Sequence, residues 1–148
     1  MLFKNNPEKE PPSDTVFLPW TALDRIGIRQ FDEEHRELVN LINQFHEAMV
    51  LRRNRVIADE IFEKLIQATR NHFSNEEALL GERGFPERDS HAKQHSDLLV
   101  EIRSLHRQFK EGSLSAMMLL TYLKNWLIHH IKESDRQYAV WLKTRGLA

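Results

Sequence analysis

Apolar residues recur at steps of three and four positions in four separate stretches of this chain, and that repetition leaves few folds open. The period places apolar side chains on one face of an α-helix, whereas a half-buried strand needs strict alternation. The first stretch follows Asp32 and the second follows Asn54, two residues suited to cap a helix N-terminus. The third lies between Pro86 and Gly112, and the fourth follows Ser113, another candidate cap. The sequence therefore predicts helices over roughly 33–53, 55–82, 88–110 and 114–132.

Short connections between helices of about twenty residues favour antiparallel neighbours. We therefore expect an all-α fold, an up-down-up-down antiparallel four-helix bundle that ends in a short C-terminal helical stub. The stretch from Thr15 to Phe31 lacks sustained periodicity and is expected to pack as an ordered N-terminal arm anchored by Trp20. Residues 1–14 carry three of the five prolines and few apolar groups, which predicts a flexible tail before a folded domain of residues 15–148.

Composition excludes several classes of protein. The chain has 148 residues and no cysteine, which excludes thiolate chemistry, zinc fingers and a disulfide scaffold, and fits a reducing compartment. A net charge of −1 gives no strong field that would favour nucleic acid. The apolar stretches are too short to span a membrane, and the N-terminus lacks the apolar core of a secretory signal. We therefore expect a cytoplasmic monomer with no nucleic-acid partner.

Eight histidines are conspicuous in this composition, because imidazole is a common metal ligand. His72 and Glu76 are four positions apart in the second predicted helix, and His91 and His95 repeat that spacing in the third. Side chains at this spacing lie about 40° apart around a helix, so each pair can reach one point. One such pair arises often by chance, but two pairs on consecutive helices favour a metal site.

Two further histidines lie at the same end of the predicted bundle. His35 is near the start of the first helix and His130 near the end of the fourth, where they meet both pairs. Asp135 adds a carboxylate, but five residues of regular helix would place it about 140° around from His130. The prediction therefore includes a break or wide turn between these two residues. The candidate metal ligands are His35, His72, Glu76, His91, His95, His130 and Asp135.

The donor set favours two metal ions over one. Five imidazoles and two carboxylates are too many for a tetrahedral zinc ion. They suit two octahedral ions that share both carboxylates and an oxo or hydroxo group as bridges. One coordination position then stays open, as reversible binding of a small diatomic molecule requires. Carboxylate-rich, ferritin-like iron pairs use paired Glu-x-x-His motifs, which this chain lacks at these positions.

Four blocks of the sequence resemble the signature blocks of the bacterial hemerythrins, in order and at matching spacing. The blocks are LPWTALDRIGIRQFDEEH, HFSNEE, GFPERDSHAKQH and WLIHHIKESDRQY, and the resemblance covers nearly everything from Phe17 onward. It identifies residues 15–148 as a hemerythrin-like di-iron domain. The chain departs from the family in its N-terminal tail and in the doubled histidine at positions 129 and 130, of which His130 fits the family's spacing to Asp135.

The resemblance also implies a cofactor and a role for each ligand. The cofactor would be two iron ions, Fe2+ or Fe3+, with an oxo or hydroxo bridge, and dioxygen would bind reversibly at the iron with the open position. The implied oxygen pocket contains Leu127, Trp126 and Ile131. One iron would be held by His91, His95 and His130, the other by His35 and His72, and both by the bridging Glu76 and Asp135.

Several residues are interpreted without a metal role. His46, His106 and His129 do not share the depth or direction of the candidate ligands. Met117 and Met118 are expected in the core. The implied activity is oxygen carriage, storage or sensing rather than catalysis, with a membrane oxidase or redox protein as a further partner. The alternatives are a di-iron oxidase, peroxidase or nitric oxide scavenger, and a plain helical interaction module.

Overall fold

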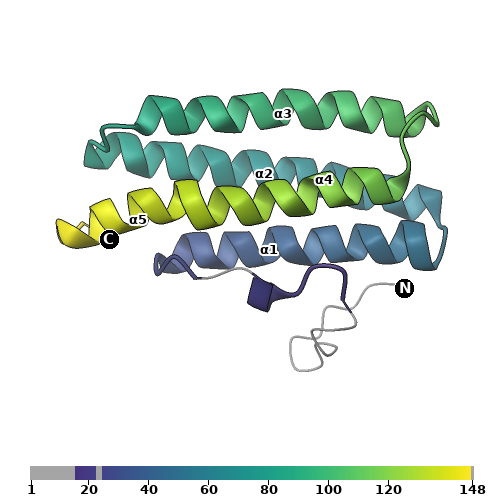
Figure 1. Cartoon of the computed structure of the whole chain (residues 1–148), viewed down its shortest axis with the longest axis horizontal. Helices are drawn as coiled ribbons and strands as arrows, with labels where there is room; N and C mark the ends of the chain where they lie inside the picture. The colour runs from purple at the N-terminus through teal and green to yellow at the C-terminus, as the bar shows by residue number, and fades with distance from the viewer. Residues whose placement is uncertain (1–15, 23–24, 148) are drawn as a thin grey trace.

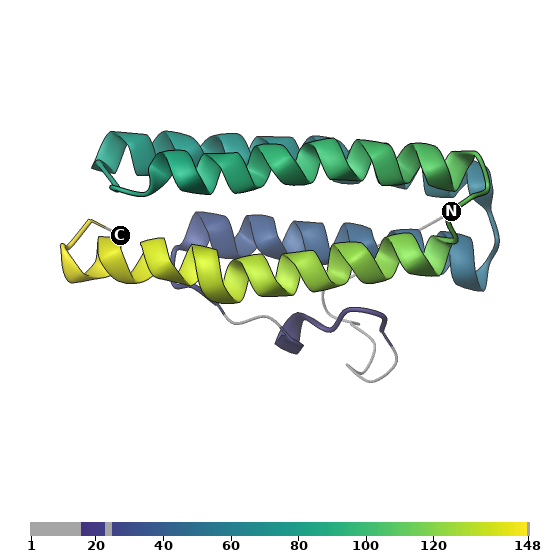
Figure 2. The same cartoon turned by 45° about the horizontal axis from the view of Figure 1, so that its top comes forward.

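The computed structural model describes residues 16–22 and 25–147, so the predicted flexible tail lies outside the described residues. Its four long helices run up, down, up and down and form an antiparallel bundle (Figures 1 and 2), which confirms the predicted fold class. Two π-helical segments, η4 and η5, each continue an α-helix. The elements in chain order are η3 (Trp20–Ala22), α1 (Arg29–His46), η4 (Glu47–Leu51), α2 (Arg55–Arg83), α3 (Arg88–Lys110), α4 (Ala116–His129), η5 (His130–Asp135) and α5 (Arg136–Thr144).

Local hydrogen bonds explain where most helices begin. The Asn54 side chain accepts a hydrogen bond from the backbone N–H of Ile57, at 3.2 Å, and caps α2 as predicted. The predicted caps Asp32 and Ser113 are wrong. Helix α4 is capped by Ser115, which accepts from the Met118 N–H at 3.1 Å, since Ser113 lies outside the helix and donates to Gln108 instead.

Asp32 has a different role from the one predicted. Helix α1 begins at Arg29, so Asp32 lies in its first turn. Its carboxylate accepts hydrogen bonds from the N–H groups of Ile26 at 2.8 Å and Gly27 at 3.1 Å. Gly27 has φ +87°, and this turn brings both N–H groups to one side chain. Asp32 thus fastens the N-terminal arm to the start of α1.

The described part of the N-terminal arm packs on α1, but its buried residue is not the one predicted. Leu18 is fully buried, whereas Trp20 is half-buried with the guanidinium of Arg36 over its ring. Asn43 in α1 donates to the Leu18 carbonyl and accepts from the Leu18 N–H, both at 2.8 Å. The arm is therefore anchored at Leu18, since an amide side chain satisfies both backbone groups of the residue.

The core fills the space between the four helices. Leu38, Phe62, Ile102 and Leu123 represent the buried faces of α1, α2, α3 and α4. The predicted stub is α5, which continues α4 through η5 and buries Tyr138 and Leu142. No helix among the described residues is long and apolar enough to cross a membrane.

The predicted burial of Met117 and Met118 is wrong. Both side chains lie in the first turn of α4 and are exposed. The apolar spacing that suggested burial extends to the first turn of α4, where the neighbouring helices do not cover the two side chains.

Candidate metal centre

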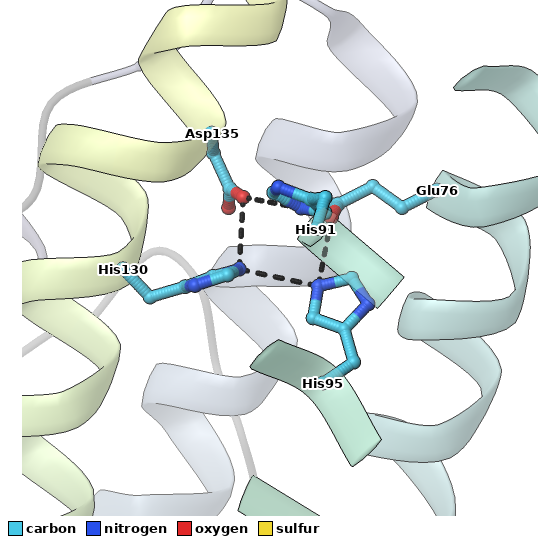
Figure 3. Close-up of side chains that lie close together, drawn as sticks. All are labelled: Glu76, His91, His95, His130 and Asp135. Atoms are coloured by element: carbon cyan, nitrogen blue, oxygen red, sulfur yellow. Dashed lines mark hydrogen bonds and ion pairs between the residues drawn. The ribbon is translucent and has the colours of Figure 1, made fainter. Parts of the chain in front are cut away.

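The structure brings all seven candidate ligands into one buried cluster. They come from four segments that meet at one end of the bundle: the first half of α1, the second half of α2, the start of α3 and the segment η5. None is more than 4% exposed. Figure 3 shows how five of them point toward one another from three neighbouring segments. The cluster consists of His35, His72, Glu76, His91, His95, His130 and Asp135.

The predicted interruption between His130 and Asp135 is confirmed as the π-helical segment η5. A π-helix closes hydrogen bonds between residues five apart, so residues at that spacing lie on one face. The result is a distance of 3.0 Å between His130 Nε2 and Asp135 Oδ1. One widened turn therefore turns the Asp135 carboxylate toward the cluster.

The side chains form two overlapping groups, each with ligand atoms within 4.8 Å of one another. The first group has three imidazoles and the second has two, and the same two carboxylates belong to both. The first contains Glu76, His91, His95, His130 and Asp135, and the second contains His35, His72, Glu76 and Asp135.

Glu76 divides its two oxygens between the groups. Its Oε1 lies 2.7 Å from His91 Nε2 and 3.2 Å from His95 Nε2, which belong to the first group. Its Oε2 lies 2.9 Å from His72 Nε2 and 3.8 Å from His35 Nε2, which belong to the second. A carboxylate placed in this way offers one ligand atom to each of two neighbouring cations.

Asp135 repeats this division. Its Oδ1 faces His130 at 3.0 Å and His91 at 3.2 Å, in the first group. Its Oδ2 faces His35 at 3.1 Å, in the second. Both carboxylates therefore lie across the boundary between the two groups.

Several buried atoms in the cluster have no hydrogen-bond partner. These are both ring nitrogens of His35 and both carboxylate oxygens of Asp135, which approach each other without hydrogen-bond geometry. Leaving such groups unsatisfied costs about 1–3 kcal/mol each, and more for a charged group. A cation among His35 Nε2 and the two Asp135 oxygens would satisfy these three atoms, so the donor set fits a metal site on structural grounds.

Electrostatics leads to the same requirement for positive charge. Burial lowers the pKa of the His72 imidazole, but the carboxylates of Glu34 and Glu76 outweigh it and raise that pKa to about 10. Burial acts likewise on His91, whose pKa is raised to about 9 by Asp135 and Glu76. Without metal, protons on these imidazoles balance the buried carboxylates, and a bound cation would replace them.

The pKa values of the two shared carboxylates are lowered. Burial raises the pKa of Glu76, but four surrounding imidazoles outweigh it and hold that pKa well below its usual value. Burial and the charge of Glu76 raise the pKa of Asp135. Contacts with His130, His35 and His91 lower that pKa by more, so it lies below its usual value. Both groups are therefore carboxylates at neutral pH, as metal ligands must be.

Three outer side chains orient the cluster, and sequence reasoning missed two of them. Glu34 Oε1 lies 2.6 Å from His72 Nδ1, and Glu77 Oε2 lies 2.8 Å from His95 Nδ1. Tyr138, left unassigned from the sequence, donates its hydroxyl to Glu76 Oε2 at 2.8 Å. Ligating histidines commonly donate their second ring N–H to a carboxylate. The available signal was that Glu34 and Glu77 each stand next to a candidate ligand.

The other three histidines stay outside the cluster, as expected. His46 is stacked on Phe17 with ring centroids 4.9 Å apart, and His106 is stacked on Phe62 at 4.2 Å. His129 is exposed and pairs with Glu133 at 3.1 Å.

A small apolar cavity lies next to the cluster. Its volume is about 30 Å³, and its walls include Phe73 and Trp126, which stack on His95 at 3.7 Å and on His130 at 4.3 Å. Four further wall residues stand three positions from a candidate ligand in their own helices, so the cavity lies one helical turn from the cluster. These are Leu38, Thr69, Leu98 and Leu127.

Two of the three residues predicted for an oxygen pocket, Leu127 and Trp126, line this cavity. The third, Ile131, is buried in η5 and is not among the residues that line it. The Thr69 hydroxyl donates to the Leu65 carbonyl at 2.7 Å, so it is already satisfied within α2. The cavity is therefore apolar in character.

A four-helix bundle with a buried cluster of five histidines and two shared carboxylates defines a metal-binding helical protein. Comparison with known families agrees with that class. Residues 26–142 match the model of the hemerythrin HHE cation binding domain. The chain belongs to the hemerythrin family.

Individual relatives cover most of the chain. A bacteriohemerythrin of Stenotrophomonas maltophilia is 29% identical over 128 residues, which is 86% of this chain and 83% of the relative. A bacteriohemerythrin of Pseudomonas aeruginosa is 30% identical over 121 residues, covering 82% and 78%. A myohemerythrin of Riftia pachyptila is 29% identical over 129 residues, covering 87% and 94%.

A crystal structure of wild-type hemerythrin supports the fold. It superposes with a TM-score of 0.68 at 22% sequence identity, over 75% of this chain and 85% of that one. At this identity the likeness bears on the arrangement of helices.

Proposed function

We propose that this protein binds dioxygen reversibly at a pair of non-haem iron ions. The observation that carries the proposal is the division of the Glu76 and Asp135 oxygens between two groups of imidazoles. A single ion would need one oxygen from each carboxylate and would leave the others unused. Family membership supports iron as the metal.

The two groups supply unequal numbers of imidazoles. The first ion would be held by His91, His95 and His130, and the second by His35 and His72, with Glu76 and Asp135 shared. The second ion would therefore have one protein ligand fewer, which would leave a position open for a small molecule. Iron, when bound there, supplies the ability to bind dioxygen and to exchange electrons with it.

The surrounding residues restrict what reaches the site. The adjacent cavity of about 30 Å³ has room for a small diatomic molecule, since a water needs only about 10–15 Å³ by a comparable measure. Its apolar walls offer no hydrogen bonds to water. We assign Leu127 and Trp126 to the oxygen pocket on this basis, and we leave out Ile131, which is buried in η5 and does not line the cavity.

The outer side chains hold the ligands in one arrangement. Glu34 and Glu77 would accept the second N–H of His72 and His95, which fixes the ring orientation and leaves Nε2 free for metal. The Tyr138 hydroxyl donates to one oxygen of Glu76 and so holds that carboxylate across the two groups. These contacts form a rigid site suited to repeated binding and release.

We propose a carrier, store or sensor rather than a catalyst, working in the cytoplasm as a monomer. A redox protein or membrane oxidase would be its further partner. The competing function is a di-iron oxidase, peroxidase or nitric oxide scavenger. Consumption of dioxygen, hydrogen peroxide and nitric oxide by the ferrous protein, each measured with excess reductant, separates the two. A carrier takes up one dioxygen per iron pair and stops, whereas continuous consumption would identify an enzyme and contradict the proposal.

A further inference from the structure

Exposed apolar side chains gather at the end of the bundle that lies away from the metal cluster. Of the six large hydrophobic residues exposed in the described part of the chain, four belong to this end. Leu51 is 67% exposed, Val56 72% and Met118 61%, and Met117 accompanies them. Exposing so much apolar surface in one place is unfavourable in water and marks a contact surface.

These residues come from segments that meet at one place. Leu51 ends η4, Val56 lies in the first turn of α2, and Met118 lies in the first turn of α4, which contacts η4. Arg55 donates from Nη2 to the Phe109 carbonyl at 3.1 Å, which ties the end of α3 to the same place. The right-hand end of Figure 1 shows these helix ends together.

The same end is strongly basic. Five cations lie in or beside these segments, although the whole chain carries a net charge of −1. They are opposed by Glu111 and by Glu47, which pairs with Arg52 at 3.4 Å. We call this surface the basic tip. It comprises residues 51–56 together with Arg107, Lys110, Met117 and Met118.

Helix electrostatics explains only part of this charge. Cations stabilise helix C-termini, and Arg55 does so directly through its bond to Phe109 in α3. Arg53 makes no hydrogen bond or ion pair among the described residues, and it holds φ at +52°, which a residue with a side chain rarely adopts. Its exposed guanidinium and the exposed apolar groups beside it therefore have no internal partner.

We propose that the basic tip binds the surface of an anionic membrane. Peripheral membrane contacts combine basic side chains that meet lipid phosphates with apolar side chains that enter the headgroup boundary. The tip has both, and the helix ends that carry it meet at one end of the bundle, where a flat bilayer can approach them together. Binding in this way leaves the metal cluster at the far end of the bundle free.

The test is co-sedimentation of the iron-loaded, full-length protein with vesicles of phosphatidylglycerol and phosphatidylcholine in equal amounts. The charge variant is Arg52→Gln/Arg53→Gln, with Arg29→Gln/Arg83→Gln as a matched control of exposed arginines elsewhere. The apolar variant is Leu51→Ser/Val56→Ser, matched by Val100→Ser/Val140→Ser, which are also exposed. Circular dichroism and iron content establish that each variant is folded.

We expect binding to the anionic vesicles, none to pure phosphatidylcholine, and weakening by salt. The charge variant should lower the partition coefficient about tenfold or more, and the apolar variant several-fold, while both controls bind like the wild type. Absence of binding by the wild type would overturn the proposal, as would equal loss in the matched controls. A third outcome combines two results: only the charge variant loses vesicle binding, and the wild type binds soluble polyglutamate as tightly as it binds anionic vesicles. This outcome would identify an acidic protein surface as the partner and overturn the membrane proposal.

Discussion

Glu76 lies where the two imidazole groups meet, fully buried and in contact with four histidines and a tyrosine. Its position on α2 is four residues after His72, so helical periodicity alone fixes their common direction. The remaining contacts come from other helices, and they determine which oxygen serves which group. Glu76 is therefore both a buried member of the site and the carboxylate that the two imidazole groups share.

Removing a ligand should remove metal, whereas removing a stacked histidine should not. We predict that His72→Ala and Glu76→Ala lower the iron content from two ions per chain towards one or none. Each substitution removes a metal ligand from at least one of the two groups. His46→Ala should keep two, since His46 contacts Phe17 and lies outside the cluster. Iron analysis after anaerobic loading measures this. Loss of iron in His46→Ala with retention in His72→Ala would refute the assignment.

The outer carboxylates should act through the histidines they contact. We predict that Glu34→Gln and Glu77→Gln each weaken iron binding about 10- to 100-fold, because the histidine loses an anionic partner for its second ring nitrogen. Competition with a chelator measures the affinity. The control is Glu33→Gln, whose exposed side chain pairs with Arg29 and should leave the affinity unchanged. Equal affinities in all three variants would show that the outer contacts are incidental.

Spacing and depth predicted six of the seven candidate ligands, because the period of a helix fixes which residues share a direction and antiparallel packing fixes their depth. Asp135 also required a break in the helix. Spacing and depth did not predict Glu34 and Glu77. Glu34 on α1 contacts His72 on α2, and Glu77 on α2 contacts His95 on α3. Contacts between helices depend on how each helix is rotated about its axis and on side-chain conformation. The sequence pattern of a single helix does not reveal either.

At the scale of elements, η5 sets the direction of Asp135. A regular α-helix would place it about 140° from His130, and the π-helical turn brings it onto the same face. The sequence predicted a break here because both residues were needed in one site. It did not predict the similar segment η4, because no pair of candidate ligands spans residues 47–51.

Deleting one exposed residue within η5 should be tolerated. We predict that deletion of Lys132 converts the π-helical turn to α-helix and keeps two irons, because His130 and Asp135 would then be four positions apart, about 40° around the helix. Deletion of Asn125, an exposed residue in regular helix α4, should rotate both ligands by about 100° and abolish iron binding. Circular dichroism and iron content compare the two. A folded Lys132 deletion without iron would mean that the widened turn itself is required.

Helix ends were predicted less well than helices. Asp32 looks like a cap, yet it accepts hydrogen bonds from the arm that precedes the helix, and Ser115 takes the role expected of Ser113. Several polar residues near a helix start can each serve, and the path of the preceding chain decides between them.

At the scale of the molecule, metal and protons compete for one buried site. We predict that iron uptake at pH 7 releases protons, because His72 and His91, with pKa values raised to about 10 and about 9, are protonated in the metal-free protein. Apparent iron affinity should rise with pH up to about 9, by about tenfold per unit for each proton released. Calorimetry in buffers of different ionisation enthalpy counts these protons. Uptake without proton release would contradict the charge balance described for the cluster.

The number and order of the helices were predicted because four periodic stretches joined by short connections allow few packings. The exposure of Met117 and Met118 was not predicted, because periodicity does not report where the neighbouring helices end. The molecule thus has a closed, metal-binding half and an end with exposed apolar and basic residues.

The most direct test of the central claim is a visible spectrum recorded on one sample through a cycle of oxygenation. The protein is loaded with ferrous iron without oxygen, its iron content is measured, air is admitted, and oxygen is then removed. We predict two irons per chain and a charge-transfer band that appears with oxygen and disappears when oxygen is withdrawn, over repeated cycles. Fewer than two irons per chain, or an irreversible change to a ferric spectrum on the first exposure to air, would contradict reversible oxygen binding at an iron pair.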